Sequence, residues 1–152
     1  MIEAYRICRR AYAAFDGEGA RRKSGRWNQD GEPMVYAAAT LSLAALEVLA
    51  HTDGNLLPDD LVYVVAEIPA SIKIIRLKLS DLPADWQQNP APNATKELGH
   101  RWVREAKTAV LAVPSAIIAI EYNYLLNPAH HDFKKIRLQA PVNFSLNPRL
   151  FT

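Results

Sequence analysis

The sequence has too little cysteine for a covalent framework. Its single cysteine, Cys8, excludes an intrachain disulfide and a zinc site built from cysteines. No apolar run approaches the roughly 18 residues needed to cross a membrane. The N-terminal stretch MIEAYRICRR carries charges where a signal peptide needs its apolar centre. These absences predict a cytoplasmic protein that does not engage a membrane.

The sequence also lacks the glycine-rich patterns that bind nucleotide phosphates. Neither GxGxxG nor GxxxxGK[ST] occurs, which argues against a Rossmann domain and a P-loop. Serine hydrolysis has little support, because no GxSxG elbow is present. A net charge of +2 is too small for a dedicated nucleic-acid binder.

What is present is enough material for one folded domain. The chain has 152 residues, of which 49% are hydrophobic, so intrinsic disorder is excluded and a sizeable core is expected. No repeat, low-complexity tract or linker interrupts it. The sequence therefore predicts a single domain over residues 1–152.

Hydrophobic patterns predict about six strands and two or three helices. One helix begins at Thr40 or Ser42 and runs to about His51, where the pair Gly54-Asn55 ends it. A second, amphipathic helix covers Thr95–Lys107, with Leu98, Trp102 and Ala106 on one stripe. The predicted strands are Ala4–Arg9, Met34–Ala38, Leu61–Ile68, Ile72–Leu79 (joined to the previous strand by a turn at Pro69), Val110–Val113, Ile117–Tyr122 and a further candidate near Ile136–Gln139. Because strands and helices do not alternate strictly, we expect a mixed α+β fold.

Glu47 is the most informative single position. It is the only charged residue in Leu41–Ala50 (LSLAALEVLA), which is apolar nearly all round and therefore expected to be buried. A carboxylate on such a helix must be paired, protonated or catalytic, because burying an isolated charge is unfavourable. An ion pair with an arginine, or a helix edge that reaches solvent, would explain it equally well.

A long polar segment, 16–31, contains Arg26 followed by Trp27 and Asn28. An arginine behind a glycine in such a loop suits bidentate recognition of phosphate or carboxylate, although a solvated basic loop is the simpler interpretation. Tyr36 lies on the next predicted strand, where aromatic residues usually belong to the core. Ser115 follows Pro114 between two apolar strands, where its hydroxyl would merely bond the backbone. Each signal is weak alone.

The run His130-His131-Asp132 invites a metal interpretation. Adjacent residues point in different directions, and no further cluster completes a coordination set. We therefore expect no metal site here.

Taken in order, these residues resemble the RES domain family, named for its arginine, glutamate and serine. The resemblance rests on the GRWN loop at 25–28, a tyrosine at Tyr36, a glutamate in an alanine- and leucine-rich helix at Glu47, and Ser115 in VPSAIIAIEYNYLLNP. The sequence Leu126-Asn127-Pro128 matches the family's Leu-Asn-Pro, and Tyr5-Arg6-Ile7 resembles its first strand. The similarity extends from about residue 4 to about 135.

The resemblance implies a fold like that of ADP-ribosyltransferases, with mixed or antiparallel sheets and flanking helices. It also implies a toxin of a bacterial toxin–antitoxin system that degrades NAD by hydrolysis or phosphorolysis. In that case Arg26, Tyr36 and Glu47 are the catalytic residues, and Arg6, Arg26, Asn28, Tyr36, Ser115 and Asn127 bind NAD. Glu47 would stabilise positive charge on the ribose, and Ser115 would donate to a phosphate or ribose oxygen.

The resemblance further implies the partners of the protein. NAD is a substrate and not a cofactor, inorganic phosphate is a candidate co-substrate, and no metal is needed. The expected protein partner is an Xre-like helix-turn-helix antitoxin that blocks the active site, while the toxin alone binds no nucleic acid. A homodimer and a hetero-oligomer with the antitoxin both stay open. Two other functions also stay open: a mono-ADP-ribosyltransferase that modifies a host protein, and a non-catalytic binding or regulatory protein.

Overall fold

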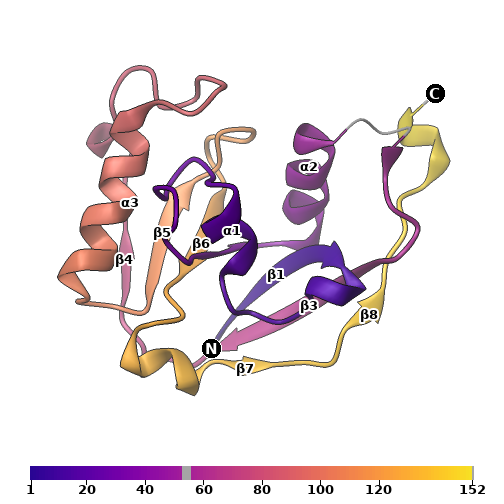
Figure 1. Cartoon of the computed structure of the whole chain (residues 1–152), viewed down its shortest axis with the longest axis horizontal. Helices are drawn as coiled ribbons and strands as arrows, with labels where there is room; N and C mark the ends of the chain where they lie inside the picture. Colours follow the sequence, from indigo (N-terminus) through magenta and orange to yellow (C-terminus); the bar gives the residue numbers. More distant parts are fainter. Residues whose placement is uncertain (53–55, 152) are drawn as a thin grey trace.

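The computed structural model describes residues 1–52 and 56–151, and in this part of the chain eight strands form one mixed sheet. Their order is β4-β5-β6-β2-β1-β3-β7, with β8 also paired to β3 (Figure 1). Only β4 and β5 run parallel among these pairs. The strands are β1 (Ile2–Arg9), β2 (Val35–Ala38), β3 (Leu61–Ile68), β4 (Ile74–Arg76), β5 (Val110–Pro114), β6 (Tyr122–Leu126), β7 (Arg137–Leu138) and β8 (Val142–Asn143).

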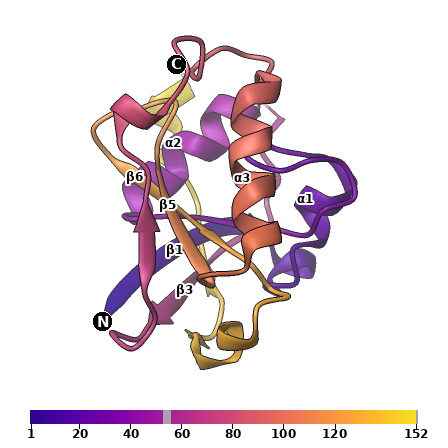
Figure 2. The ribbon, with the colours of Figure 1, turned by 90° about the vertical axis from the view of Figure 1, so that its left-hand side faces the viewer.

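Three α-helices accompany the sheet in the described ranges: α1 (Glu18–Arg22), α2 (Leu41–His51) and α3 (Asn93–Glu105). Short 3-10 turns occupy Arg10–Tyr12, Leu79–Asp81, His131–Lys135 and Pro148–Phe151. In Figure 1, α1 lies between α3 on the left and α2 on the right, and the C-terminal segment lies to the right of α2. In the view of Figure 2, α3 stands in front. None of the helices described is long and apolar enough to cross a lipid bilayer. The predicted α+β fold is confirmed.

The two faces of the sheet carry separate cores. One face contributes Val64, Ala66, Val110, Ala112 and Leu126 to the largest cluster of buried side chains. The other face is divided into two clusters. Near α3 the cluster contains Trp27, Trp86, Trp102, Leu111 and Leu125, and near α2 it contains Ile7, Ala38, Leu43 and Ala44. The candidate site described below lies on this divided face.

The C-terminal segment covers the outer edge of β3. Both β7 and β8 pair with β3, and the ring of Phe144 packs edge-on against Tyr63 with their centroids 6.3 Å apart. Arg10 also donates a hydrogen bond to Asn143. An uncovered strand edge is a template for unwanted pairing, so this segment protects the sheet.

Several predicted elements are confirmed. The strand predicted at Leu61–Ile68 is β3, and the helix predicted to end near His51 is α2. Thr40 is its cap, because its hydroxyl oxygen accepts a hydrogen bond from the amide of Leu43 at 3.1 Å. The stop signal assigned to Gly54-Asn55 lies outside the described residues.

Other predictions are wrong for physical reasons. Residues 117–121 form a turn and not a strand, because the Ser115 hydroxyl accepts hydrogen bonds from the amides of Ile117 and Ile118. The strand predicted at 72–79 shrinks to β4 and pairs with β5, far across the sheet from β3. The helix α3 ends at Glu105, and Ala106 is exposed with φ 51° instead of extending its apolar stripe.

The expectation of a buried helix around Glu47 is also wrong. Only Leu43 and Ala44 of α2 are buried, while Leu46 is 40% exposed. The helix lies on the sheet with one face and leaves the other in solvent. An apolar composition alone therefore overstated its burial.

Candidate functional site

Two neutral donors hold the Glu47 carboxylate. The Ser115 hydroxyl and the Asn123 side-chain amide each donate to Oε1 of Glu47, both at 2.8 Å. The second oxygen, Oε2, has no hydrogen bond within the described residues. Neither donor is charged, so the carboxylate is oriented without being neutralised. The predicted alternative of an ion pair with an arginine does not describe this arrangement.

A tight turn between β5 and β6 sets the position of Ser115. Its amide donates to the carbonyl of Glu121 at 2.8 Å, and its hydroxyl oxygen accepts from the amides of Ile117 and Ile118 at 3.1 and 3.2 Å. Ser115 is 0% exposed, and its one hydroxyl hydrogen is used on Glu47. In this structure the Ser115 hydroxyl therefore serves Glu47, and the expected contact with NAD stays a prediction.

Asn123 is a site residue that the sequence analysis missed. It lies at the start of β6, between Ala38 of β2 and Val113 of β5 in the register of the sheet. The sequence did contain an indication of this role, because Asn123 is the only amide side chain in the otherwise apolar and aromatic strand YNYLL. The strand was predicted at 117–122, so Asn123 fell outside it and was not considered.

Arg26 is anchored by the loop that precedes α3. Its Nη1 donates to the carbonyls of Trp86 and Gln88 at 2.8 and 2.6 Å. Partial burial lowers the pKa of Arg26, whereas the negative charge of Glu47 and the phenol of Tyr36 act in the opposite direction. The other guanidinium nitrogens make no hydrogen bond to the described residues.

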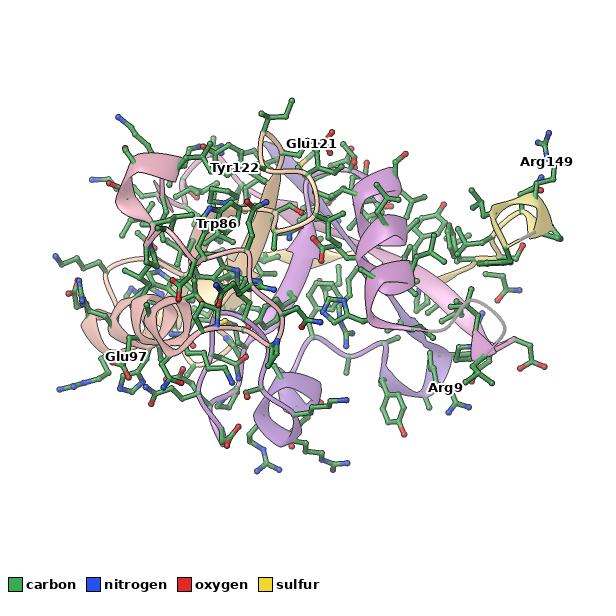
Figure 3. All side chains as sticks on the ribbon, turned by 90° about the horizontal axis from the view of Figure 1, so that it is seen from above. Arg9, Trp86, Glu97, Glu121, Tyr122 and Arg149 are labelled. Atoms are coloured by element: carbon green, nitrogen blue, oxygen red, sulfur yellow. The ribbon has the colours of Figure 1, made fainter. Side chains whose placement is uncertain are left out.

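The anchoring loop lies beside the β5–β6 turn. Gln87 donates from Nε2 to the carbonyl of Ala116 at 3.2 Å, which ties the two segments together. Figure 3 shows Trp86 near the turn that carries Glu121 and Tyr122. The segment 81–92 supplies both carbonyls that hold Arg26.

Asn28 and Tyr36 organise the loop that carries Arg26. Asn28 is 0% exposed, and its Oδ1 accepts from the amide of Gly25 at 2.8 Å and from the phenol of Tyr36 at 2.7 Å. The phenol oxygen accepts in turn from the amide of Trp27 at 3.0 Å. Burial raises the pKa of Tyr36, which keeps the phenol protonated and able to donate. Asn28 therefore shapes the loop, and its expected contact with NAD stays a prediction.

The helix α3 presses directly against this loop. A Cβ added at Gly99 would lie 1.6 Å from the carbonyl oxygen of Trp27, so only glycine permits this approach. Lys96 donates to the hydroxyl of Ser24 at 2.9 Å, and the His100 ring lies 2.8 Å from the Glu32 carboxylate. These contacts hold the loop against α3.

The structure does not bring Arg6 and Asn127 to Glu47. Tyr5 packs with the cluster at α2, and neighbouring side chains of a strand point to opposite faces. Arg6 therefore projects from the other face of the sheet, where its Nη1 donates to the carbonyl of Tyr12 at 2.8 Å. Its guanidinium also lies 5.6 Å from the ring centroid of Phe15. Asn127 follows the far end of β6, is 4% exposed and caps a turn by accepting from the amide of Ala129 at 3.0 Å. Both residues hold loops in this structure.

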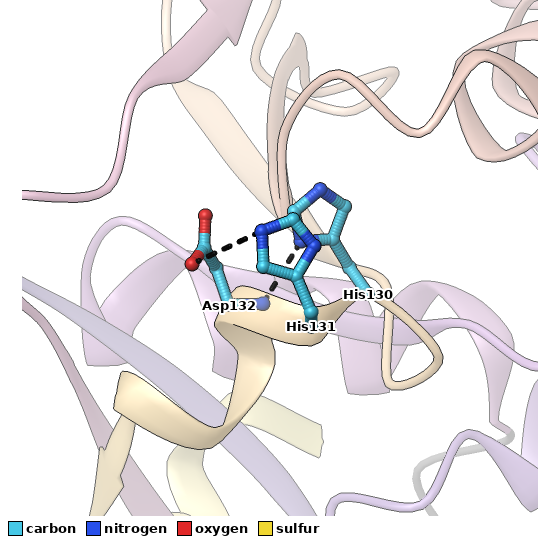
Figure 4. A group of neighbouring side chains, drawn as sticks. All are labelled: His130, His131 and Asp132. Carbon is cyan, nitrogen blue, oxygen red and sulfur yellow. Dashed lines mark hydrogen bonds and ion pairs between the residues drawn. The ribbon is translucent and has the colours of Figure 1, made fainter.

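The His130-His131-Asp132 cluster caps a 3-10 turn (Figure 4). His130 Nε2 lies 2.9 Å from the carbonyl of Ala106, and His130 Nδ1 accepts from the amide of Asp132 at 3.0 Å. Asp132 forms an ion pair with Lys135 at 2.9 Å, which lowers the pKa of its carboxyl. The side chains thus have structural partners, and the expectation that they bind no metal stays a prediction.

Changing Tyr36 to phenylalanine should destabilise the fold by about 1–3 kcal/mol, because the amide of Trp27 loses its acceptor and Asn28 loses a donor. Urea unfolding would measure this loss. Tyr12→Phe is the matched control, since Tyr12 is 59% exposed and should change stability little. Equal stability of the two variants would contradict the role given to the phenol.

Comparison with known proteins relates this chain to a protein family. Residues 3–147 match the family model described as the RES domain. The chain is 36% identical over 149 residues to a protein named Toxin Res from Yersinia enterocolitica, covering 96% of this chain and 97% of that protein. It is 37% identical over 147 residues to a Prs ADP-ribosylating toxin from Sphingobium, covering 93% and 90%.

A solved structure shows the same fold. It is the crystal structure of the MbcT–MbcA toxin–antitoxin complex of M. tuberculosis, which superimposes with a TM-score of 0.75 at 19% identity. The match covers 99% of this chain and 86% of the other.

Proposed function

The chain belongs to the RES domain family, and we propose that it is the toxin of a bacterial toxin–antitoxin pair which cleaves the bond between nicotinamide and ribose in NAD. The observation that carries the chemistry is the Glu47 carboxylate, which two neutral donors orient through Oε1. Relatives named as toxins support the biological role.

Glu47 suits a reaction in which positive charge develops on a sugar. When the C1′–N bond breaks, its electron pair moves to the nicotinamide nitrogen and the ribose acquires oxocarbenium character. A carboxylate already fixed beside the ribose stabilises this charge without reorganising. Water or phosphate then forms the new C1′–O bond and loses a proton to solvent.

The other residues divide between binding and support. The unused guanidinium nitrogens of Arg26 would bind the pyrophosphate of NAD. The ring of Tyr36 would stack on the nicotinamide or its ribose, while its phenol keeps the loop in place. Ser115 and Asn28 would act through Glu47 and the loop, and a direct role for Arg6 or Asn127 stays a prediction.

The purified protein without antitoxin should release nicotinamide from NAD. Running the assay with and without inorganic phosphate identifies the acceptor. Release in both buffers indicates a hydrolase, and release that requires phosphate indicates a phosphorylase. A folded protein that binds NAD but releases no nicotinamide would contradict both.

A second candidate is a mono-ADP-ribosyltransferase, favoured by the name of the Sphingobium relative. In that case the ADP-ribose passes to a protein side chain instead of water or phosphate. Label from the adenine part of NAD should then appear on a protein band in a bacterial extract. If the purified protein releases nicotinamide equally fast with and without the bacterial extract, the first candidate is favoured.

The proposed partner is an antitoxin of the Xre helix-turn-helix type that covers the Glu47 site. Co-expression with the neighbouring reading frame should give a complex that no longer turns over NAD. Whether such a complex also contains two copies of this chain is a separate question, which light scattering of the complex answers.

A further inference from the structure

The side-chain amide of Asn123 donates to Glu47, but its carbonyl oxygen lacks a hydrogen bond of its own in the described part of the chain. Its Nδ2 donates to Oε1 of Glu47, whereas its carbonyl oxygen Oδ1 is buried and has no partner among the described residues. A buried acceptor without a hydrogen bond destabilises a folded protein. Such an exception in a folded chain calls for an explanation.

The surroundings of Asn123 offer no structural reason for an amide. Its neighbours across the sheet are Ala38 and Val113, both apolar and both buried. On packing grounds alone, leucine has the same branching at Cγ and would leave no orphaned oxygen in this position. The asparagine therefore meets a need other than stability.

That need is visible at the carboxylate of Glu47. The amide must present Nδ2 to Glu47, because Oδ1 in that position would repel the carboxylate oxygen. Ser115 donates to the same oxygen from the end of β5, so two donors from different strands fix the carboxyl group. Oε2 is thereby left free of protein hydrogen bonds.

We infer that Asn123 is a positioning residue, which orients Glu47 so that Oε2 faces the substrate, and that the chain retains its orphaned Oδ1 for this purpose. The inference rests on the proposed NAD cleavage. Asn123 acts through Glu47 and does not touch NAD itself. Its loss should therefore reduce the chemical step more than substrate binding.

Two variants separate this role from a structural one. Asn123→Leu removes both the donor and the orphaned acceptor, and Asn123→Asp keeps the shape but replaces the donor by a second carboxylate. Each should lower kcat for nicotinamide release at least about tenfold and leave KM nearly unchanged. The melting temperature of Asn123→Leu should equal or exceed that of the wild type, since the unpaired acceptor is gone.

Thr108→Val is the matched control. Thr108 is also a buried polar residue next to β5, but its hydroxyl serves Trp102 and the backbone of Val110, away from Glu47. This variant should melt at a lower temperature and keep its kcat. Its pattern is thus the reverse of the one expected for Asn123→Leu.

The outcomes distinguish the proposed NAD cleavage from the positioning role of Asn123. A folded wild-type protein without NAD turnover refutes the proposed function, and the role of Asn123 falls with it. Wild-type turnover with an unchanged kcat in both Asn123 variants refutes the positioning role alone. A melting temperature of Asn123→Leu that falls as far as that of Thr108→Val shows a structural residue and also refutes it.

Discussion

Glu47→Gln should reduce the rate of nicotinamide release from NAD by about 10²–10³-fold, the effect typical of losing one preorganised charge-stabilising group. The amide oxygen of glutamine can still accept the hydrogen bonds from Ser115 and Asn123, so the variant should fold. What it lacks is the negative charge that offsets the cationic ribose. Single-turnover measurement of nicotinamide gives the rate, and circular dichroism verifies the fold.

Glu121→Gln is the control for this change. Glu121 lies on the β5–β6 turn beside the site but is exposed, and its backbone alone supports Ser115 (Figure 3). The control should retain nearly full activity because exposed charges are strongly screened. A folded Glu47→Gln protein that releases nicotinamide as fast as this control rules out the assignment of Glu47.

The second large effect is expected far from the carboxylate, at Gly99→Ala. The added Cβ would meet the carbonyl oxygen of Trp27 at 1.6 Å, so either α3 or the Arg26 loop must move. Overpacking of this kind costs about 1–3 kcal/mol or more, which exceeds the gain of roughly 1 kcal/mol from replacing a helical glycine by alanine. Since the displaced loop carries Arg26, KM for NAD should also rise.

Gly19→Ala provides a control with the opposite sign. Gly19 is also helical, in α1, but nothing lies within 4 Å of the position where its Cβ would stand. This variant should be slightly stabilised, by about 0.5–1 kcal/mol, and keep its KM. Thermal unfolding and steady-state kinetics of both variants test the pair. Equal stability of Gly99→Ala and Gly19→Ala would contradict the close approach of α3 to the loop.

Sequence patterns correctly predicted the elements that depend on interactions between residues close in the sequence. The β-branched run of β3 and the capped apolar helix α2 follow from propensity and periodicity. The turn after Ser115 did not, because the apolar sequence AIIAI resembles a strand. One hydroxyl accepting two backbone amides is enough to bend it, and sequence periodicity does not report that bond.

The sequence predicted several residues of the candidate site but only some of the contacts between them. The resemblance singled out Arg26, Glu47 and Ser115, but which of them touch depends on pairing between distant strands. The pairing of the strands brings the Ser115 hydroxyl into hydrogen-bond contact with Glu47 and places Arg6 on the opposite face of the sheet. Asn123 and the carbonyls that hold Arg26 carry no motif of their own, so only the three-dimensional arrangement reveals them.

The spacing of the Glu47 hydrogen bonds also bears on how the protein is synthesised. Its two donors follow it by 68 and 76 residues, and the strand that contains Asn123 lies between β5 and β2 in the sheet. A nascent chain on the ribosome thus displays its glutamate long before the groups that orient it, since such non-local contacts form only after the intervening segment is made. The Glu47 site is therefore assembled only after the chain has been translated beyond Asn123.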